Sequence, residues 1–291
     1  MSRREAAEPI SLKKRVKKQL ALLPGYIPLL IWLAFLLATV GWIVLASLSK
    51  TSEIYTDSIL KSGFHFENYA KAWNTNNVAQ YFLNSVICSL TACAAVVLIA
   101  APASYILGHK IFKGRNTLIN AFLISMSIPT VMIVIPMFSI LVKMNLVGKL
   151  STLIVLYIAA NVPYTVYFLT SFFGSIPSAL EEAALIDGCS QYKAFWKIIL
   201  PMAQPGIITV TIFNFMNMWN EYFMALIFAN SSDSTRTLAV GLQNMINAMK
   251  YSGDWAGLFA SVIIVFLPTF ILYLFLSDKI ISGITGGAVK G

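Results

Sequence analysis

Long apolar runs recur along the chain and are separated by shorter polar segments. They occupy residues 26–48, 82–108, 117–142, 151–173, 206–229 and 257–278, with almost no charged residue inside them. Each run is long enough to cross about 30 Å of hydrocarbon as a helix. The runs are continuously apolar rather than alternating, which favours helices over the strands of a barrel. The pattern therefore predicts an all-α integral membrane protein with six transmembrane helices.

Composition supports one membrane domain rather than two soluble domains. Of the 291 residues, 58% are hydrophobic and only 11% are charged, whereas soluble domains carry about 25% charged residues. The basic N-terminal stretch followed by residues 26–48 is similar to a secretory signal. Its apolar part is too long for one, however, and no convincing small-residue cleavage site follows. We therefore expect this segment to be retained as the first span.

The distribution of basic residues predicts the orientation of the spans. The formal charge of +9 is compatible with nucleic-acid binding, but seven of the 21 basic residues lie before residue 19. With the six spans above, that side of the membrane has fourteen Lys and Arg residues and the other side has seven. The positive-inside rule then places both termini in the cytoplasm. The predicted parts are a basic tail at 1–25, a transmembrane domain at 26–280 and a C-terminal tail at 281–291.

The connections at 49–81 and 230–256 are then expected on the outer side. They contain turn-forming and aromatic residues, among them Asn74, Asn76, Asn77 and Trp255. These residues fit either the docking of a soluble partner or ordinary solvated loops. Within the predicted spans, Pro129 and other prolines each remove a backbone hydrogen bond, which predicts kinks used for packing or for transport.

The connection at about 174–205 is predicted to fold into two short helices. Ser178 and Glu181 have the spacing of a capping box, which predicts a helix start. Gly188 is placed to end that helix in a left-handed conformation. Ser190 is expected to cap a second helix, which Leu200-Pro201 ends. In that helix Tyr192, Phe195, Trp196 and Ile199 recur at the spacing of one apolar stripe.

An apolar stripe on a polar loop usually marks contact with a protein partner. Two other interpretations compete. The segment from Ala184 to Ser190 also resembles the turn of a DNA-binding helix-turn-helix, but the second helix lacks polar side chains suited to base edges. The other is that the loop merely covers the end of the helix bundle.

The sequence Glu182-Ala183-Ala184-x-x-Asp187-Gly188, followed after nine intervening residues by Ile198-x-Leu200-Pro201, resembles the EAA loop of ABC-importer permease subunits. Cys189 stands where that family usually has alanine or another small residue. Residues 105–115, Trp219-Asn220-Glu221 and the C-terminal Gly287-Ala288-Val289-Lys290-Gly291 look like the carbohydrate-uptake branch, the maltose-permease-like subunits. The resemblance covers about residues 81–291.

The resemblance implies a type I ABC importer transmembrane fold in the cytoplasmic membrane of a bacterium or archaeon. It also implies a second permease subunit, an extracytoplasmic solute-binding protein and two ATPase subunits that use ATP with Mg. The cargo implied is a sugar or oligosaccharide, with another polar solute as the alternative. The implied ATPase-coupling residues are Glu182, Ala183, Ala184, Asp187, Gly188, Tyr192, Phe195, Trp196, Ile199, Leu200 and Pro201.

The fifth predicted span carries a polar stripe. Asn214 and Asn217 lie seven and four residues before Glu221, on nearly the same helix face. An ionisable group inside a membrane is costly and indicates a functional site. We expect these three residues to line a substrate pathway, in which amide and carboxylate groups bind hydroxyls. The alternative is that the two asparagines join this span to a neighbouring helix through hydrogen bonds.

No Walker A motif is present, so the chain is not expected to bind ATP or to be an enzyme. His65 and His109 lack further ligands at metal-binding spacing, and the three cysteines form no readable framework. We therefore expect no catalytic residues, no metal and no cofactor bound by this chain. Energy must come from separate ATPase subunits or from an ion gradient. The second option is a secondary transporter coupled through Glu221, although the sequence has no detectable inverted repeat.

Overall fold

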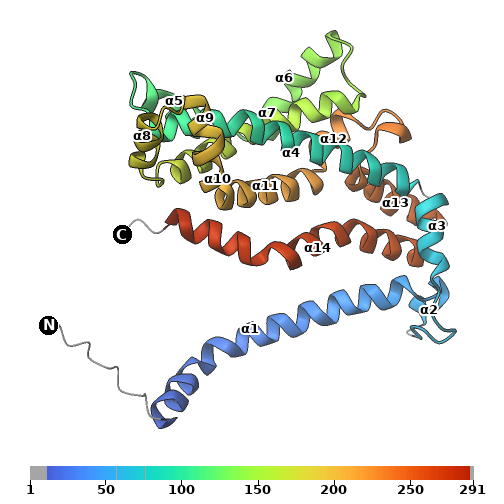
Figure 1. Cartoon of the computed structure of the whole chain (residues 1–291). Coiled ribbons are helices and arrows are strands. Elements are labelled where there is room, and N and C mark those ends of the chain that lie inside the picture. The colour runs from blue at the N-terminus through green and yellow to red at the C-terminus, as the bar shows by residue number, and fades with distance from the viewer. Residues whose placement is uncertain (1–11, 57, 76, 289–291) are drawn as a thin grey trace.

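The computed structural model describes residues 12–56, 58–75 and 77–288, and within these ranges the chain contains helices and no strands (Figure 1). Arg3 and Arg4 of the predicted N-terminal tail, Asn76 and the last three residues lie outside the described residues. Helix α1 begins at Leu12 and α14 continues to Ala288. The described parts of both predicted tails are therefore helical extensions of the neighbouring spans.

Four described helices are long and apolar enough to cross a membrane alone, and they match four of the six predicted runs. They are α1 (Leu12–Ser47), α4 (Val78–His109), α7 (Leu150–Phe173) and α14 (Trp255–Ala288). Their apolar spans are Pro24–Ser47, Val78–His109, Leu150–Phe173 and Trp255–Ser277. The ends differ from the predicted runs by only a few residues because loss of apolar character marks the membrane boundary on both sides.

The third predicted span is a bent pair rather than one helix. Helix α5 (Arg115–Met126) and α6 (Thr130–Lys143) meet at 92°. Pro129 precedes the first residue of α6 in extended conformation, where a residue without a backbone N–H costs no intrahelical bond. Where the sequence predicted a kink at Pro129, the structure therefore has a complete break between two helices.

The fifth predicted span, 206–229, is also interrupted, so its prediction as one continuous helix is wrong. It divides into α11 (Gln204–Trp219) and α12 (Phe223–Phe228). The helical segment 191–202 before α11 meets it at 72°. Counting each bent pair as one span raises the number of candidate spans in the described chain from four to six.

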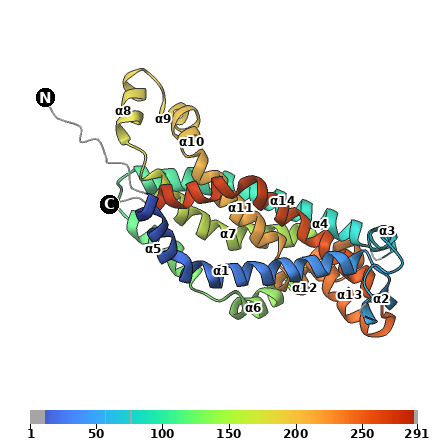
Figure 2. The ribbon, with the colours of Figure 1, turned by 90° about the horizontal axis from the view of Figure 1, so that it is seen from below.

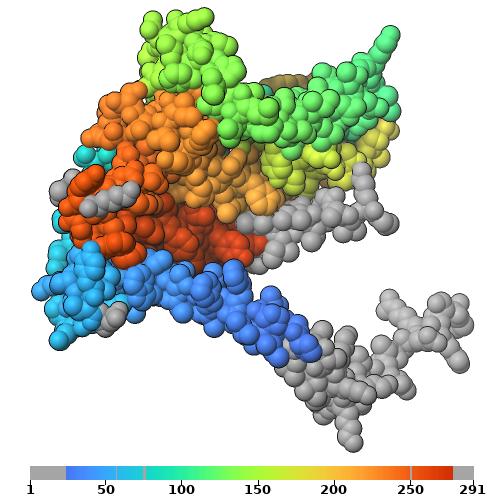
Figure 3. All heavy atoms as spheres, turned by 180° about the vertical axis from the view of Figure 1, so that it is seen from behind, coloured from blue at the N-terminus to red at the C-terminus, as the bar shows by residue number. Residues whose placement is uncertain are grey.

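The core lies where α4 runs beside α7 and α11. Fully buried residues there include Cys88 and Val96 of α4 and Leu153 of α7, with Phe228 of α12 at the same cluster. Helix α1 packs mainly along α14, with a further contact between Ser47 at its end and Tyr69 of α3, and just 6% of its apolar span is buried. In Figure 3, α1 (blue) and the α6 region (light green) protrude on opposite sides. Their apolar side chains require lipid or a partner subunit to cover them.

The short helices gather at the two ends of the bundle (Figure 2). One end carries α8 (Ser178–Ile186), α9 (Gln191–Ala194), the π-helical segment η1 (Phe195–Ile199) and α10 (Leu200–Met202). The opposite end carries α2 (Thr51–Tyr55), α3 (Glu67–Thr75), η2 (Asp233–Thr235) and α13 (Leu238–Ser252). Residues 49–81 and 230–256, predicted on one side of the membrane, thus meet at the end opposite to the loop at 174–205.

Candidate functional site

The first helix of the loop, α8, does not begin with the predicted capping box. Pro177 precedes the helix and Ser178 is already its first residue, without a side-chain cap bond. The carboxylate of Glu181 points into the protein instead, and only 4% of this residue is exposed. The prediction failed because a positively charged partner for Glu181 lies about seventy residues earlier in the chain, where a local pattern cannot reveal it.

Glu181 is held by three side chains from the C-terminal end of α4. The hydroxyl of Tyr105 donates to Glu181 Oε1 at 2.7 Å, and the ammonium of Lys110 bonds to the same oxygen. His109 Nδ1 lies 3.6 Å from Glu181 Oε2. Burial raises the pKa of Glu181, but the bonds from Lys110 and Tyr105 outweigh it and hold that pKa below its ordinary value. Helix α8 is therefore attached to α4 by an ionised, buried carboxylate.

The turn after α8 has the predicted left-handed glycine. Gly188 has φ +80°. Its N–H donates to the carbonyl of Leu185 at 3.1 Å, and the N–H of Cys189 donates to the carbonyl of Ala184 at 2.9 Å. This bonding pattern is the Schellman motif. The predicted cap at Ser190 is also confirmed, because its hydroxyl accepts the N–H of Lys193 at 3.3 Å.

The predicted apolar stripe of the second helix is divided between two faces. Phe195 and Ile199 are buried in a cluster with residues of α4 and α7, whereas Tyr192 is 73% exposed and Trp196 is 40% exposed. The π-helical bonding of η1 changes the angular spacing assumed for a regular α-helix. Pro201 does not end the helix, which continues to Met202 because Pro201 lies near the start of α10 and needs no amide bond there.

The other predicted coupling residues also differ in exposure. Ala184 is buried and Leu200 is half-buried, whereas the exposed ones are Glu182, Ala183, Asp187, Gly188 and Pro201. Large apolar side chains stand beside them, with Ile186 86% exposed and Leu185 38% exposed. The loop therefore presents an apolar outer face, and its buried residues attach it to the bundle.

A second set of predicted residues lies between α11 and α7. The amide of Asn214 donates to Thr165 Oγ1 at 2.9 Å, and the amide of Asn217 donates to Asn161 Oδ1 at 2.9 Å. Asn161 donates in turn to the carbonyl of Tyr157 at 2.8 Å. These bonds are the helix-joining contacts considered as the alternative role of the two asparagines.

The same residues also line two adjoining cavities. One, of about 380 Å³, is bordered by Tyr164 and Asn214 and the other, of about 370 Å³, by Tyr157 and Glu221. Asn161 and Asn217 line both. Amide, phenol and carboxylate groups therefore converge on one space beside α5 and α6, which also has apolar lining such as Met126 and Met218 and is called the polar cavity below. Sequence reasoning missed Asn161, although an asparagine inside the fourth apolar run was the available signal.

Glu221 lies in the break between α11 and α12 rather than within a helix. Its carboxylate accepts the backbone N–H groups of Met224 at 2.7 Å and Ala225 at 3.0 Å. The hydroxyl of Tyr157 donates to Glu221 Oε2 at 3.0 Å. A negative charge at the N-terminus of α12 satisfies amides that have no partner within the helix. Glu221 thus both shapes the break and borders the cavity.

Trp219 and Asn220, which precede Glu221, point away from the polar stripe as predicted. Trp219 is buried, and its indole N–H donates to the carbonyl of Val265 on α14 at 3.1 Å. Asn220 is exposed and bonds to the carbonyl of Met216 in its own helix at 2.8 Å. The first residue therefore packs α11 on α14, and the second remains open to the surroundings.

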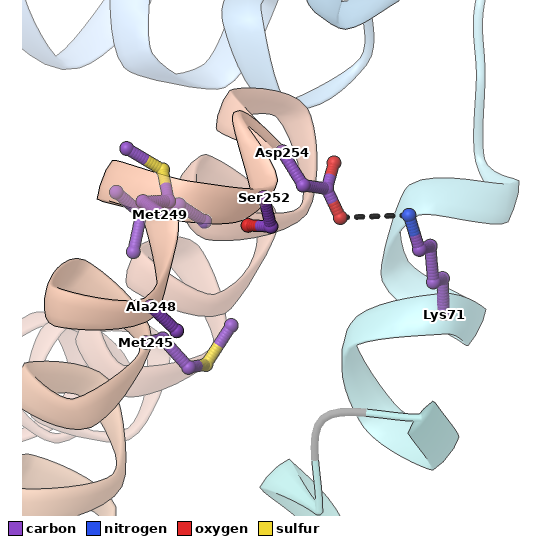
Figure 4. A pocket seen from close by; sticks show the side chains of 7 residues that line it. Lys71, Met245, Ala248, Met249, Ser252 and Asp254 are labelled. Carbon is purple, nitrogen blue, oxygen red and sulfur yellow. Dashed lines mark ion pairs between the residues drawn. The ribbon is translucent and has the colours of Figure 1, made fainter.

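A further cavity of about 250 Å³ lies at the opposite end of the bundle, between α3, α13 and the start of α14 (Figure 4). The ammonium of Lys71 is 2.8 Å from Asp254 Oδ2 across this space. Asp254 also accepts the N–H of Gly257 at 3.2 Å. Burial raises the pKa of Asp254, but the bond from Lys71 and that N–H hold it below its ordinary value. The pair ties the connections at 49–81 and 230–256 together.

Comparisons with known proteins agree with this arrangement. The family described as "binding-protein-dependent transport system inner membrane component" matches residues 100–282. The diacetylchitobiose uptake system permease protein NgcG of Streptomyces coelicolor is 32% identical, over 90% of this chain and 87% of its own length. The trehalose transport system permease protein SugB of Mycobacterium tuberculosis is 30% identical, over 88% of this chain and 93% of its own.

A similar fold occurs in a solved structure. One chain of a bacterial ABC transporter that imports the acidic polysaccharide alginate superimposes with a TM-score of 0.79 at 19% sequence identity, covering 94% of this chain and 99% of the other. This likeness extends over nearly the whole chain, and so over more of it than the family match does. By sequence and by fold, the chain belongs to the family of inner-membrane components of binding-protein-dependent transport systems, and it is a membrane-embedded permease of an ABC importer.

Proposed function

We propose that this chain translocates a sugar or oligosaccharide across the cytoplasmic membrane by alternating access, driven by ATP with Mg bound to two separate ATPase subunits. The observation that carries the proposal is the connection between the helical loop and the polar cavity. The loop continues through α10 directly into α11, and α11 carries Asn214 and Asn217. Movement of the loop therefore reaches the helix that lines the cavity.

The proposed topology has six spans, the third made of α5 and α6 and the fifth made of α11 and α12, with both termini in the cytoplasm. The loop at 174–205 then forms a cytoplasmic helix pair. Lys110, Lys113 and Arg115, between α4 and α5, belong to the same end as the loop. This end has the excess of basic residues that marks the cytoplasmic side.

We place the ATPase subunits on the face of the loop that points away from the helix bundle, where the exposed Ile186, Tyr192 and Trp196 form an apolar surface. The extracytoplasmic solute-binding protein is placed at the opposite end, on α2, α3 and α13. A solved alginate transporter of similar fold, with a TM-score of 0.65 and 16% identity, is in complex with an alginate pentasaccharide-bound periplasmic protein. A second permease subunit and the lipid bilayer are the proposed covers for the exposed apolar residues of α1 and α6.

The cavity chemistry supports an uncharged polyhydroxylated cargo. Asn161, Asn217 and Tyr157 supply hydrogen-bond donors and acceptors beside apolar residues such as Met224, the usual composition of a small-molecule site. The relatives named above transport diacetylchitobiose and trehalose. The ion-coupled alternative is weaker because Glu221 already accepts three hydrogen bonds from Tyr157 and the start of α12.

The test is transport by the complete importer reconstituted in proteoliposomes, with a panel of radiolabelled oligosaccharides. We expect uptake to require three components: the ATPase subunits, ATP on their side of the vesicle membrane, and the solute-binding protein on the other side. Uptake driven by a proton or sodium gradient without ATPase subunits would favour the secondary-transporter alternative. Uptake of a polar solute but of no sugar would keep the permease role and replace the substrate class.

A further inference from the structure

Tyr105 of α4 contacts both helices of the loop. Its hydroxyl donates to Glu181 of α8 at 2.7 Å. Its ring centroid lies 4.9 Å from that of Phe195 in η1. Tyr105 is 5% exposed, so both contacts are shielded from water. One side chain of a spanning helix is therefore held by the two halves of the loop.

The contact with Glu181 is costly to break. Glu181 is 4% exposed, and the ammonium of Lys110 adds its positive charge to the bond from Tyr105. Removing one partner of a buried, hydrogen-bonded charge leaves that charge without compensation. Separation of α8 from the end of α4 is thus disfavoured, and the two are expected to move together.

Helix α4 is in turn fixed to α7 close to Tyr105. The hydroxyl of Ser104 donates to the carbonyl of Val166 at 3.1 Å. Gly108 of α4 lies against α7 as well, because a Cβ atom at this position would be 2.9 Å from the carbonyl oxygen of Thr170 in α7. The space between the two backbones at this point is therefore too small for a Cβ atom, and α7 also carries Asn161, which lines the polar cavity.

The covalent route from the loop to the cavity is less rigid than this packed route. It passes through the three-residue helix α10 and then through the break at Ala203, where the chain bends by 72°. Such a bend permits one segment to rotate without the other. A packed connection through α4 therefore gives a displacement of the loop a second, stiffer route to the cavity beside the covalent one.

We propose that Tyr105 and Glu181 are positioning residues that make the loop, the end of α4 and α7 move as one body. The inference rests on the proposed docking of ATPase subunits on the loop. It assigns α4, rather than α11 alone, to the transmission of movement from the ATPase subunits to the polar cavity.

The first experiment compares Tyr105→Phe, Glu181→Gln and Lys110→Met with the control Lys113→Met, an exposed lysine in the same connection. The complete importer in proteoliposomes is assayed for ATP hydrolysis and for uptake. We expect the three variants to assemble and to hydrolyse ATP like the wild type, with uptake per ATP reduced within the roughly 5- to 150-fold range of a lost coupling. Lys113→Met should keep the wild-type ratio. An unchanged ratio in all three, or a parallel fall of hydrolysis and uptake, would overturn the proposal.

The second experiment uses no variant of the contact itself. Spin labels are placed at Ile111→Cys, beside the end of α4, and at Ala179→Cys in α8, both exposed positions. The labelled chain also carries Cys189→Ser, so that the spin label does not react with this partly exposed cysteine. Cys88 and Cys93 are buried and can stay. We expect the same interlabel distance in the nucleotide-free complex and in the ATP-bound, hydrolysis-blocked complex.

A changed distance in an importer that transports would overturn the one-body inference and leave the proposed function intact. Absence of any ATP-dependent uptake by the wild type would instead contradict the proposed function. The distance measurement decides the inference even if the Tyr105 and Glu181 variants fail to assemble.

Discussion

The hydroxyl of Tyr157 on α7 donates to the carboxylate of Glu221 at 3.0 Å, and both residues line the same cavity. Tyr157 is only 2% exposed, so its hydroxyl depends on this acceptor. The same carboxylate accepts two backbone N–H groups of α12. Glu221 therefore has three roles: it caps α12, it accepts an interhelical bond from Tyr157, and it places a charge at the cavity. Different substitutions of Glu221 separate these roles.

We expect Glu221→Ala to destabilise the reconstituted complex, because a buried hydroxyl left without a partner costs about 1–3 kcal/mol and a lost cap about 1 kcal/mol. Glu221→Gln keeps one amide oxygen, which can still accept from Tyr157 and the N–H of Ala225, while it removes the charge and the acceptor of the Met224 N–H. We expect the Gln variant to assemble normally and to lose uptake efficiency roughly tenfold or more, since hydrogen bonds to charged groups contribute about 1.5–3 kcal/mol.

Thermal unfolding of the purified complex and initial uptake rates measure these two effects separately. Asn220→Ala is the matched control, since Asn220 is exposed and bonds only within its own helix among the contacts described. Wild-type uptake by Glu221→Gln would limit Glu221 to capping α12.

The pattern of apolar runs predicted the straight spans well because hydrophobic length is a local property of the sequence. The breaks were harder to place. The predicted apolar run continues through Glu221, whereas the structure ends α11 at Trp219 and uses the Glu221 carboxylate as an acceptor for the first N–H groups of α12.

Local signals in the loop succeeded where the partner was near in sequence and failed where it was far. Gly188 and Ser190 bond within four residues, and both were predicted. Glu181 has the spacing of a capping box, but tertiary bonding to Tyr105 and Lys110 replaces the local bond. The division between Phe195 and Tyr192 required knowledge of the packed bundle as well.

Gly188 should be sensitive to substitution for conformational reasons alone. Its φ is +80°, yet a Cβ atom at this position would meet nothing within 4 Å. The left-handed conformation costs other residues about 1–2 kcal/mol, with Asn among the exceptions. We expect Gly188→Ala to weaken binding of the ATPase subunits roughly tenfold, whereas Gly188→Asn stays close to the wild type. Co-purification and titration of the ATPase subunits onto the permease measure this difference, and equal affinities for the two variants would contradict it.

Gly108 tests the close approach of α4 to α7. A Cβ there would lie 2.9 Å from the carbonyl oxygen of Thr170 and 3.0 Å from the backbone nitrogen of Gly174. Backbone atoms cannot turn aside as a side chain can, so we expect Gly108→Ala to destabilise the protein by about 1–3 kcal/mol. The midpoint of thermal unfolding in detergent should fall. Gly41→Ala on α1, with nothing within 4 Å of its Cβ, should show no decrease, and equal midpoints for the two variants would refute the packing argument.

The attachment of α8 to the end of α4 should weaken at acidic pH and stay unchanged from neutral to mildly alkaline pH. The bonds from Lys110 and Tyr105 hold the pKa of Glu181 below 4.5, its ordinary value, despite burial. A depressed carboxyl pKa contributes stability that is complete above the unfolded value and is lost as pH falls through the folded value. Proteolytic cleavage of α8 should therefore be constant from about pH 5 to pH 8 and increase below pH 4.5, once corrected for protease activity. Glu181→Gln cannot ionise at this position, so its loop should be cleaved faster at neutral pH and should lose this dependence. A rise in wild-type cleavage between pH 6 and pH 8 would instead indicate that a group other than Glu181 controls the loop.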